Sequence, residues 1–180
     1  MPTCDDIILL ARYNATMNRN VYDAAASLPH EAIVAERGAF FGSVLGTLNH
    51  LVAGDTIWLM RFAGHARPLR ALDALRGAPV PSDLRQSYGA SLPILRAQRE
   101  RLDRTITALA DELASPDLEH VLVYRNTRGM VFCKPFGSLL LHLFNHQAHH
   151  RGQASTLLTQ AGVDIGVTDL LMLIEDRVPE

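Results

Sequence analysis

The apolar residues of the first third of the chain recur at the spacing of amphipathic helices. Thr3, with Asp6 three residues later, has the pattern of a capping box, and a helical period of apolar residues then runs up to Pro29. A second helical period covers FFGSVLGTLNHLVAGDTIWLMRFAG and stops around Gly64, although this stretch contains four glycines. The pattern therefore predicts one helix over about residues 4–27 and a second helix that carries His50.

A third helix is expected after a polar connection between Pro68 and Pro81. Ser82 is a natural N-cap for this helix, and Pro93 is expected to kink the helix or to end its first part, because proline cannot donate the backbone hydrogen bond of a helix interior. The helical period ends near Ala114.

The last third of the chain predicts a hairpin followed by one more long helix. Apolar residues alternate over 121–123 and 130–132, on either side of the turn-forming RNTRG. The last long helix opens after Pro135 and stops at Gly162, and VTDLLMLIEDR predicts a short final helix. The fold class is therefore all-α, a four-helix bundle with a short β-hairpin insertion before the last long helix, and such bundles often hold metal sites in their cores.

Composition favours one globular domain over residues 1–180. The chain is 48% hydrophobic and 20% charged, which is ordinary globular usage, and its proline and glycine residues are not gathered into a linker. The formal net charge of -2 gives no electrostatic reason to expect a nucleic-acid partner. We therefore expect no nucleic-acid partner.

Two further observations concern the cellular compartment. No apolar stretch approaches the roughly 20 residues that a membrane span needs, and Asp5 and Asp6 stand where a signal peptide would be basic. Cys4 and Cys133 are the only cysteines and lack the spacing of a redox or zinc motif, so we expect two free thiols. Together these observations predict a cytoplasmic protein that does not bind a membrane.

Histidines carry the candidate chemistry. His142, His146, His149 and His150 share one broad face of the last long helix. Two histidines at i and i+4 can converge on one metal ion if a third ligand comes from another helix. His50 is the candidate for that ligand, and its helix face includes Ser43, Gly46, Thr47 and Gly54, small residues expected to leave space around the imidazole. Spacing alone does not choose between the pairs His142/His146 and His146/His150.

The sequence around these histidines resembles a known family. LLLHLFNHQAHHRGQASTLLTQAG followed by DIGVTDLL is similar to the C-terminal signature of the DinB/YfiT-like metalloenzymes, and GTLNHLVAGDTIWLMRF is similar to their second-helix signature. The pair Tyr13-Asn14 and the segment VYRNTRGMVFCKP also fit the family pattern, so the resemblance covers nearly the whole chain.

The resemblance implies a fold and a ligand set. The fold is a four-helix bundle of up-down-down-up topology, usually a homodimer, with one divalent metal ion, nickel or zinc, bound by three histidines. Carried over residue by residue, the metal ligands are His50, His146 and His150. His142 and His149 then become candidates for lining the pocket or supporting the ligands.

Four more residues are candidates for a supporting role. Asn14 and Asn18 lie one turn apart on the first helix and could present amides to a polar substrate or to metal-bound water. Trp58 could wall the pocket, and Gln153 returns to the histidine face and could support a ligand. The arginines of the third helix, Arg99 among them, are expected first on a solvated face.

Three functions are compatible with such a site. The first is a metal-dependent transferase that acts on a low-molecular-weight thiol and a small electrophile, as the resemblance implies. The alternatives are a non-catalytic, stress-associated metal-binding bundle and a metal-dependent hydrolase. An open three-histidine site favours an enzyme over a structural metal site, which usually has four protein ligands.

Overall fold

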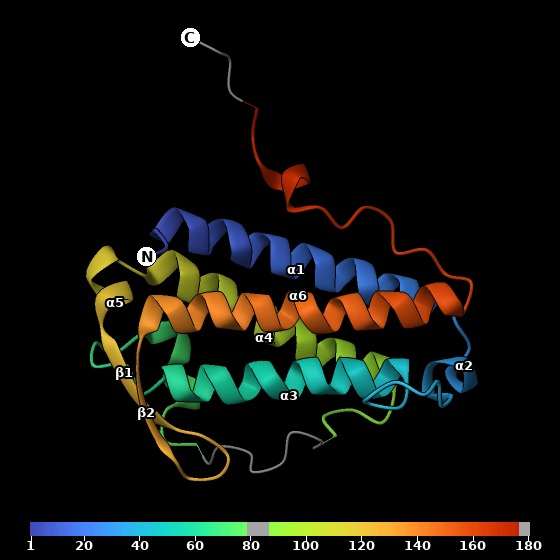
Figure 1. The fold of residues 1–180 in the computed structure, drawn as a ribbon, viewed down its shortest axis with the longest axis horizontal. Helices are drawn as coiled ribbons and strands as arrows, with labels where there is room; N and C mark the ends of the chain where they lie inside the picture. The colour runs from blue at the N-terminus through green and yellow to red at the C-terminus, as the bar shows by residue number, and fades with distance from the viewer. Residues whose placement is uncertain (79–86, 177–180) are drawn as a thin grey trace.

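The computed structural model describes residues 1–78 and 87–176. Four long helices lie side by side in it (Figure 1): α1 (Cys4–Ala26), α3 (Val44–Phe62), α4 (Leu92–Glu112) and α6 (Phe136–Gln160). Helix α1 packs against both α4 and α6, and helix α3 packs against the same two helices. The fold is mostly helical, as the sequence predicts.

Local signals at the helix ends explain where three of these helices begin and end. The Thr3 hydroxyl accepts a hydrogen bond from the Asp6 backbone N–H and the Asp6 carboxylate accepts one from that of Thr3, which confirms the capping box of α1. At the start of α3, Ser43 Oγ accepts from the Gly46 N–H. Helix α6 ends before Gly162, whose φ of 81° is a left-handed conformation that favours glycine.

The beginning of α4 differs from the expectation. This helix starts at Leu92, so Pro93 lies in its first turn rather than at a kink or at the end of a first part. Proline is well tolerated there because the N–H that it lacks would have no partner within the helix. Ser82, the expected N-cap, lies outside the described residues, and Ser91 occupies the cap position of α4.

Four short helical elements complete the helical part of the described residues. They are the five-residue helices α2 (His30–Val34) and α5 (Ser115–Glu119) and the 3-10 helices η1 (Arg70–Leu75) and η2 (Leu170–Leu173). The expected final helix over VTDLLMLIEDR is reduced to η2. Helices α2 and α5 were not predicted, because five residues are too few to show a helical period.

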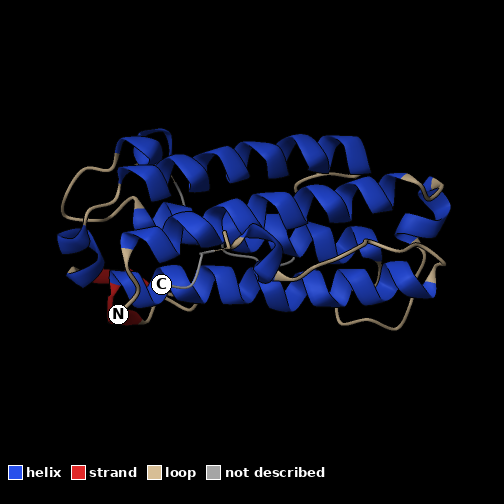
Figure 2. Ribbon diagram, turned by 90° about the horizontal axis from the view of Figure 1, so that it is seen from above, coloured by secondary structure: helices blue, strands red, loops and turns tan. Residues whose placement is uncertain are grey.

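The β-hairpin is confirmed before the last long helix. Strand β1 (Val121–Arg125) pairs antiparallel with β2 (Val131–Pro135), and Val123 lies opposite Cys133 in the register. The hairpin lies at one end of the helices (Figure 2), and the buried side chain of Leu122 attaches it to the core. The free thiols Cys4 and Cys133 are partly buried and exposed, respectively, and no disulfide joins them.

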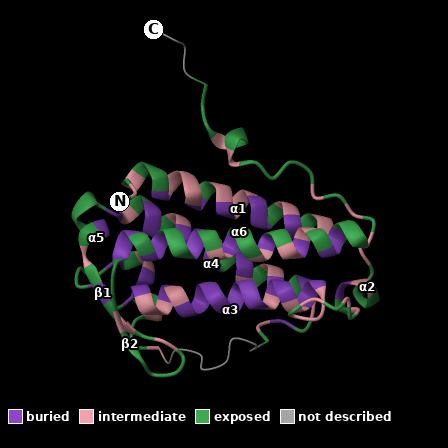
Figure 3. Ribbon diagram, viewed as in Figure 1, coloured by how far each residue is buried: buried purple, intermediate pink, exposed green. Residues whose placement is uncertain are grey.

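The hydrophobic core lies between the four long helices. Helix α3 is buried along most of its length, whereas α6 alternates between buried and exposed faces (Figure 3). Among the described residues, no helix is long and apolar enough to span a membrane. A helix as buried as α3 can hold its one histidine, His50, inside the bundle.

Candidate metal centre

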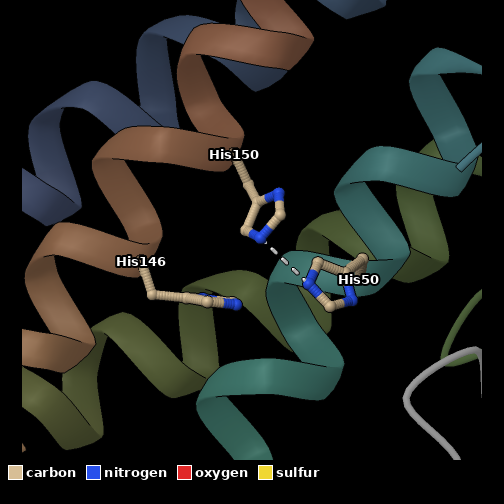
Figure 4. A group of neighbouring side chains, drawn as sticks. All are labelled: His50, His146 and His150. Carbon is tan, nitrogen blue, oxygen red and sulfur yellow. Dashed lines mark hydrogen bonds between the residues drawn. The ribbon is translucent and has the colours of Figure 1, made fainter. Parts of the chain in front are cut away.

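Three histidines from two helices meet inside the bundle. His50 comes from α3, and His146 and His150 come from successive turns of α6 (Figure 4). One ligand atom of each lies within 4.8 Å of those of the other two, and the Nε2 atoms of His50 and His150 are 3.1 Å apart. Of the two pairs that spacing left open, the structure brings His146 and His150 together with His50, so these three residues could hold a metal ion.

The donor set fits a divalent ion. Two nitrogens bound to one tetrahedral ion at ~2.0–2.1 Å are about 3.3–3.4 Å apart, close to the separation of the His50 and His150 Nε2 atoms. Within the described part of the chain, the buried Nδ1 of His146 has no hydrogen-bond partner. Burial, together with the neighbouring histidines, lowers the pKa of His146 to about 3, so its imidazole is neutral near pH 7. The neutral form is the one that binds metals.

Gln153 lies beside the histidines of α6. Its Oε1 is 2.8 Å from Nδ1 of His150, and its Nε2 is 3.3 Å from Nε2 of His149. If His150 carries its proton on Nδ1, this contact directs the unprotonated Nε2 toward His50. His149 is exposed, and it touches the site through Gln153 and through a ring contact with His150.

Small residues on the His50 face line open space beside the imidazole, as expected, and they also permit close packing. A Cβ added to Gly54 would lie 2.7 Å from Cε1 of His146, so this glycine makes room for the imidazole from α6. A Cβ added to Gly46 would lie 2.0 Å from the carbonyl oxygen of Phe41. Both glycines thus permit close packing, because a side chain at either position would overlap a group that builds the site.

Phe41 belongs to the site but was missed from the sequence. Its ring stacks on the imidazole of His50 with the ring centroids 3.9 Å apart, and it also contacts His150 edge-on. Phe41 stands in the loop before α3, and loop residues have no periodicity that would reveal the direction of their side chains. The pair of phenylalanines before GSVLG was the one available signal.

Trp58 and His142 lie together beside the three histidines. The Trp58 ring packs on His142 at 4.8 Å and on Tyr124 of the hairpin at 5.4 Å, and the Arg61 guanidinium lies 4.6 Å from its centroid. The exposed His142 has its ring 6.1 Å from that of His146. This cluster therefore borders the site without joining the group of three.

Asn14 and Asn18 point into a different polar group. Both are buried, and their side chains hydrogen-bond to Asp103 of α4 and to Arg151 of α6. Arg99 of α4 is 1% exposed and lies in the same group, so the expectation of a solvated face is wrong for this arginine. Its burial is stabilised by Asp55, which accepts a hydrogen bond of 2.6 Å.

A mostly helical fold with three converging histidines defines a class of helical proteins that could hold a divalent metal. The family model described as the DinB family matches residues 1–178, and the chain belongs to this family. It is similar to Protein DinB of Bacillus subtilis (strain 168), with 23% identity over 168 residues that cover 89% of this chain and 88% of that protein. No solved structure matches the chain significantly.

Proposed function

We propose that His50, His146 and His150 hold one divalent metal ion, nickel or zinc, and that the protein is a metal-dependent transferase. Its substrates would be a low-molecular-weight thiol and a small electrophile. The observation that carries the proposal is the convergence of three imidazoles without a cysteine or a carboxylate in the group, among the described residues. Structural zinc sites usually have four protein ligands, so a three-ligand site favours an ion with an open position.

The chemistry proposed for this site is a nucleophilic substitution. A divalent ion in the site would supply Lewis acidity, which lowers the pKa of a thiol or a water molecule that it binds. In the transfer, the sulfur forms a bond to a carbon of the electrophile, the leaving group departs with the electrons of its bond, and the thiol proton passes to solvent. The hydrolase alternative would use water in place of the thiol.

A cavity beside His50 supports a small-molecule substrate. Its volume is about 560 Å³, and its lining includes Phe40, Phe41 and the ring of His50. Among the described residues that line it, Glu36 alone is charged. The two phenylalanines and this single carboxylate favour a neutral or cationic electrophile of modest size over an anionic one.

The arrangement of the helices supports the bundle topology that the family resemblance implies. In Figure 1, α1 and α6 run in one direction while α3 and α4 run in the other, as expected for up-down-down-up order. The packing of α1 and α3 against both α4 and α6 agrees with a closed bundle of these helices. The homodimer and the cytoplasmic location stay predictions.

A transfer assay tests the proposed activity. Protein loaded with zinc or nickel is mixed with a small thiol such as cysteine and with 1-chloro-2,4-dinitrobenzene, and formation of the thioether is followed by absorbance. We expect turnover that disappears after chelation and in His146→Ala but persists in His30→Ala, which removes an exposed histidine from α2. Ester hydrolysis without thiol dependence would favour the hydrolase, and metal binding without either reaction would favour the non-catalytic bundle.

A further inference from the structure

A chain of buried polar side chains runs through the core beside the candidate metal centre. Every member but one is at most 6% exposed, the exception being Asp103, whose side chain is 12% exposed. The members come from all four long helices, and we call them the core polar network: Asn14 and Asn18 of α1, Asp55 of α3, Arg99 and Asp103 of α4, and Gln147 and Arg151 of α6.

The contacts of this network are continuous from α3 to α6. Arg99 donates to Asp55 at 2.6 Å and forms an ion pair with Asp103 at 3.0 Å. Asp103 in turn accepts from the Asn18 amide at 2.8 Å. Arg151 donates to the side-chain oxygen of Asn14 and, at 3.3 Å, to that of Gln147. A shift of any one long helix would therefore break at least one contact of a buried polar group, which is costly in a low-dielectric interior.

On α6 the network lies next to the candidate metal ligands. Gln147 directly follows His146, and Arg151 directly follows His150. The two histidines are spaced i and i+4, and so are Gln147 and Arg151. Each of these pairs therefore forms a stripe along the helix, and the two stripes lie about 100° apart. One stripe faces α3 with its imidazoles, while the other hydrogen-bonds toward α1. The contacts of Arg151 therefore tie α6 to α1 on the stripe next to the candidate metal ligands.

The composition of the network argues for such an orienting role. It contains two carboxylates and two guanidinium groups, so its formal charges balance. Buried ion pairs are weak stabilisers, since the cost of removing the charges from water offsets much of their attraction. A better-attested use of buried polar groups is to select one packing arrangement over others of similar free energy, and helices packed through apolar residues alone could slide or rotate with smaller penalties.

We propose that the core polar network positions the metal ligands of α6, with Arg151 as its principal positioning residue. This inference rests on the metal site proposed above and assigns to Arg151 and Asp103 a role in metal affinity without contact to the ion. Partners that orient metal ligands typically contribute 10–100-fold to affinity. A network that served stability alone would leave the affinity of the folded protein unchanged.

The test separates metal affinity from folding. Arg151→Met removes the guanidinium, and the double variant Arg151→Met/Asp103→Asn also removes one carboxylate, so that the remaining Asp55–Arg99 pair stays balanced. The dissociation constant for Zn²⁺ is measured by competition with a chromophoric chelator. The temperature is chosen so that circular dichroism shows each variant to be folded. The visible absorption of the Co²⁺-loaded protein reports the ligand geometry directly.

The matched control is another ion pair, in which the exposed Arg67 guanidinium donates to the buried Asp117 carboxylate at 2.6–2.7 Å. Both residues lie outside α6, and neither belongs to the core polar network. The double variant Arg67→Met/Asp117→Asn removes one guanidinium and one carboxylate, as the test variant does. It is expected to keep the Zn²⁺ affinity and the Co²⁺ spectrum of the unmodified protein.

We expect the Arg151→Met/Asp103→Asn variant to bind Zn²⁺ 10–100-fold more weakly than the unmodified protein and to show an altered Co²⁺ spectrum. Arg151→Lys, which retains a cation, should recover part of that affinity. Affinity and spectrum unchanged in a folded double variant would overturn the inference while leaving the metal site intact. Failure of the unmodified protein to bind any metal would instead refute the proposed function.

Discussion

The metal site and the helix that carries it have different requirements at Gly54. This glycine lies in the interior of α3, and a Cβ there would be 2.7 Å from Cε1 and 3.3 Å from Nδ1 of His146. Carbon atoms do not approach this closely, so Gly54→Ala must displace the imidazole. The ring belongs to a side chain of α6 and can rotate away, which would remove His146 from the group of three.

Two opposing effects set the magnitude. Alanine is favoured over glycine in a helix interior by about 0.5–1 kcal/mol. Overlap in a packed interior costs about 1–3 kcal/mol if the neighbours cannot give way, and less if the ring rotates. The free energy of unfolding of the metal-free variant should therefore differ from that of the unmodified protein by at most about 2 kcal/mol. Its metal affinity should fall at least tenfold, since losing about 1.4 kcal/mol of binding free energy is already a factor of ten.

Competition titrations with Zn²⁺ and thermal unfolding of the metal-free protein measure the two quantities. Gly152→Ala is the matched control, because this glycine also lies inside a long helix, α6, and a Cβ there would meet nothing within 4 Å. The control should be as stable as the unmodified protein or more so, with the same affinity. Wild-type affinity in Gly54→Ala would refute the argument that the His146 ring needs the space above this glycine.

The remaining predictions concern a supporting residue, metal removal and pH. Gln153→Leu removes the acceptor beside His150 and should weaken Zn²⁺ binding 10–100-fold in the same titration, whereas an unchanged affinity would show that His150 needs no such support. Chelation should lower the midpoint of thermal unfolding, because an ion at 100 times its dissociation constant stabilises the folded state by about 2.7 kcal/mol. If chelation lowered the midpoint of His146→Ala by the same amount, that result would contradict this site. The hydrogen bonds from Arg67 lower the pKa of Asp117, so this carboxylate stabilises the fold above its ordinary value of 3.8 and less as the pH falls below it. Asp117→Asn should therefore lower the free energy of unfolding by about 1–2 kcal/mol near pH 7. In unfolding curves recorded at acid pH, this difference should shrink as the pH falls below the ordinary carboxyl pKa of 3.8, and a constant difference would contradict the assignment.

The long helices could be predicted from the sequence because their signals are local. The capping box at Thr3 and the left-handed glycine at Gly162 act within a few residues, and the apolar period extends over whole helices. The first turn of α4 was harder, because Pro93 is compatible both with a kink and with a helix start. Contacts with other elements decide between these two possibilities, and such contacts leave no local pattern.

The same distinction applies to the candidate site. Periodicity placed the histidines of α6 on one face, but the choice of His150 over His142 needed the family resemblance or the structure. The sequence did not reveal Phe41, whose loop has no period. It also did not reveal the burial of Arg99, which depends on Asp55 from another helix as well as on Asp103 one turn away. A buried arginine is recognisable only once its partners are known.

The stoichiometry of metal binding shows whether His50, His146 and His150 together hold one ion. Metal-free protein is titrated with Zn²⁺ and Ni²⁺ beside the single variants His50→Ala, His146→Ala and His150→Ala, with His30→Ala as the control. We expect one ion per chain in the unmodified protein and in the control, and loss of that ion in each of the three variants. Binding that survives all three substitutions, or an unmodified protein that takes up neither metal, would contradict this expectation.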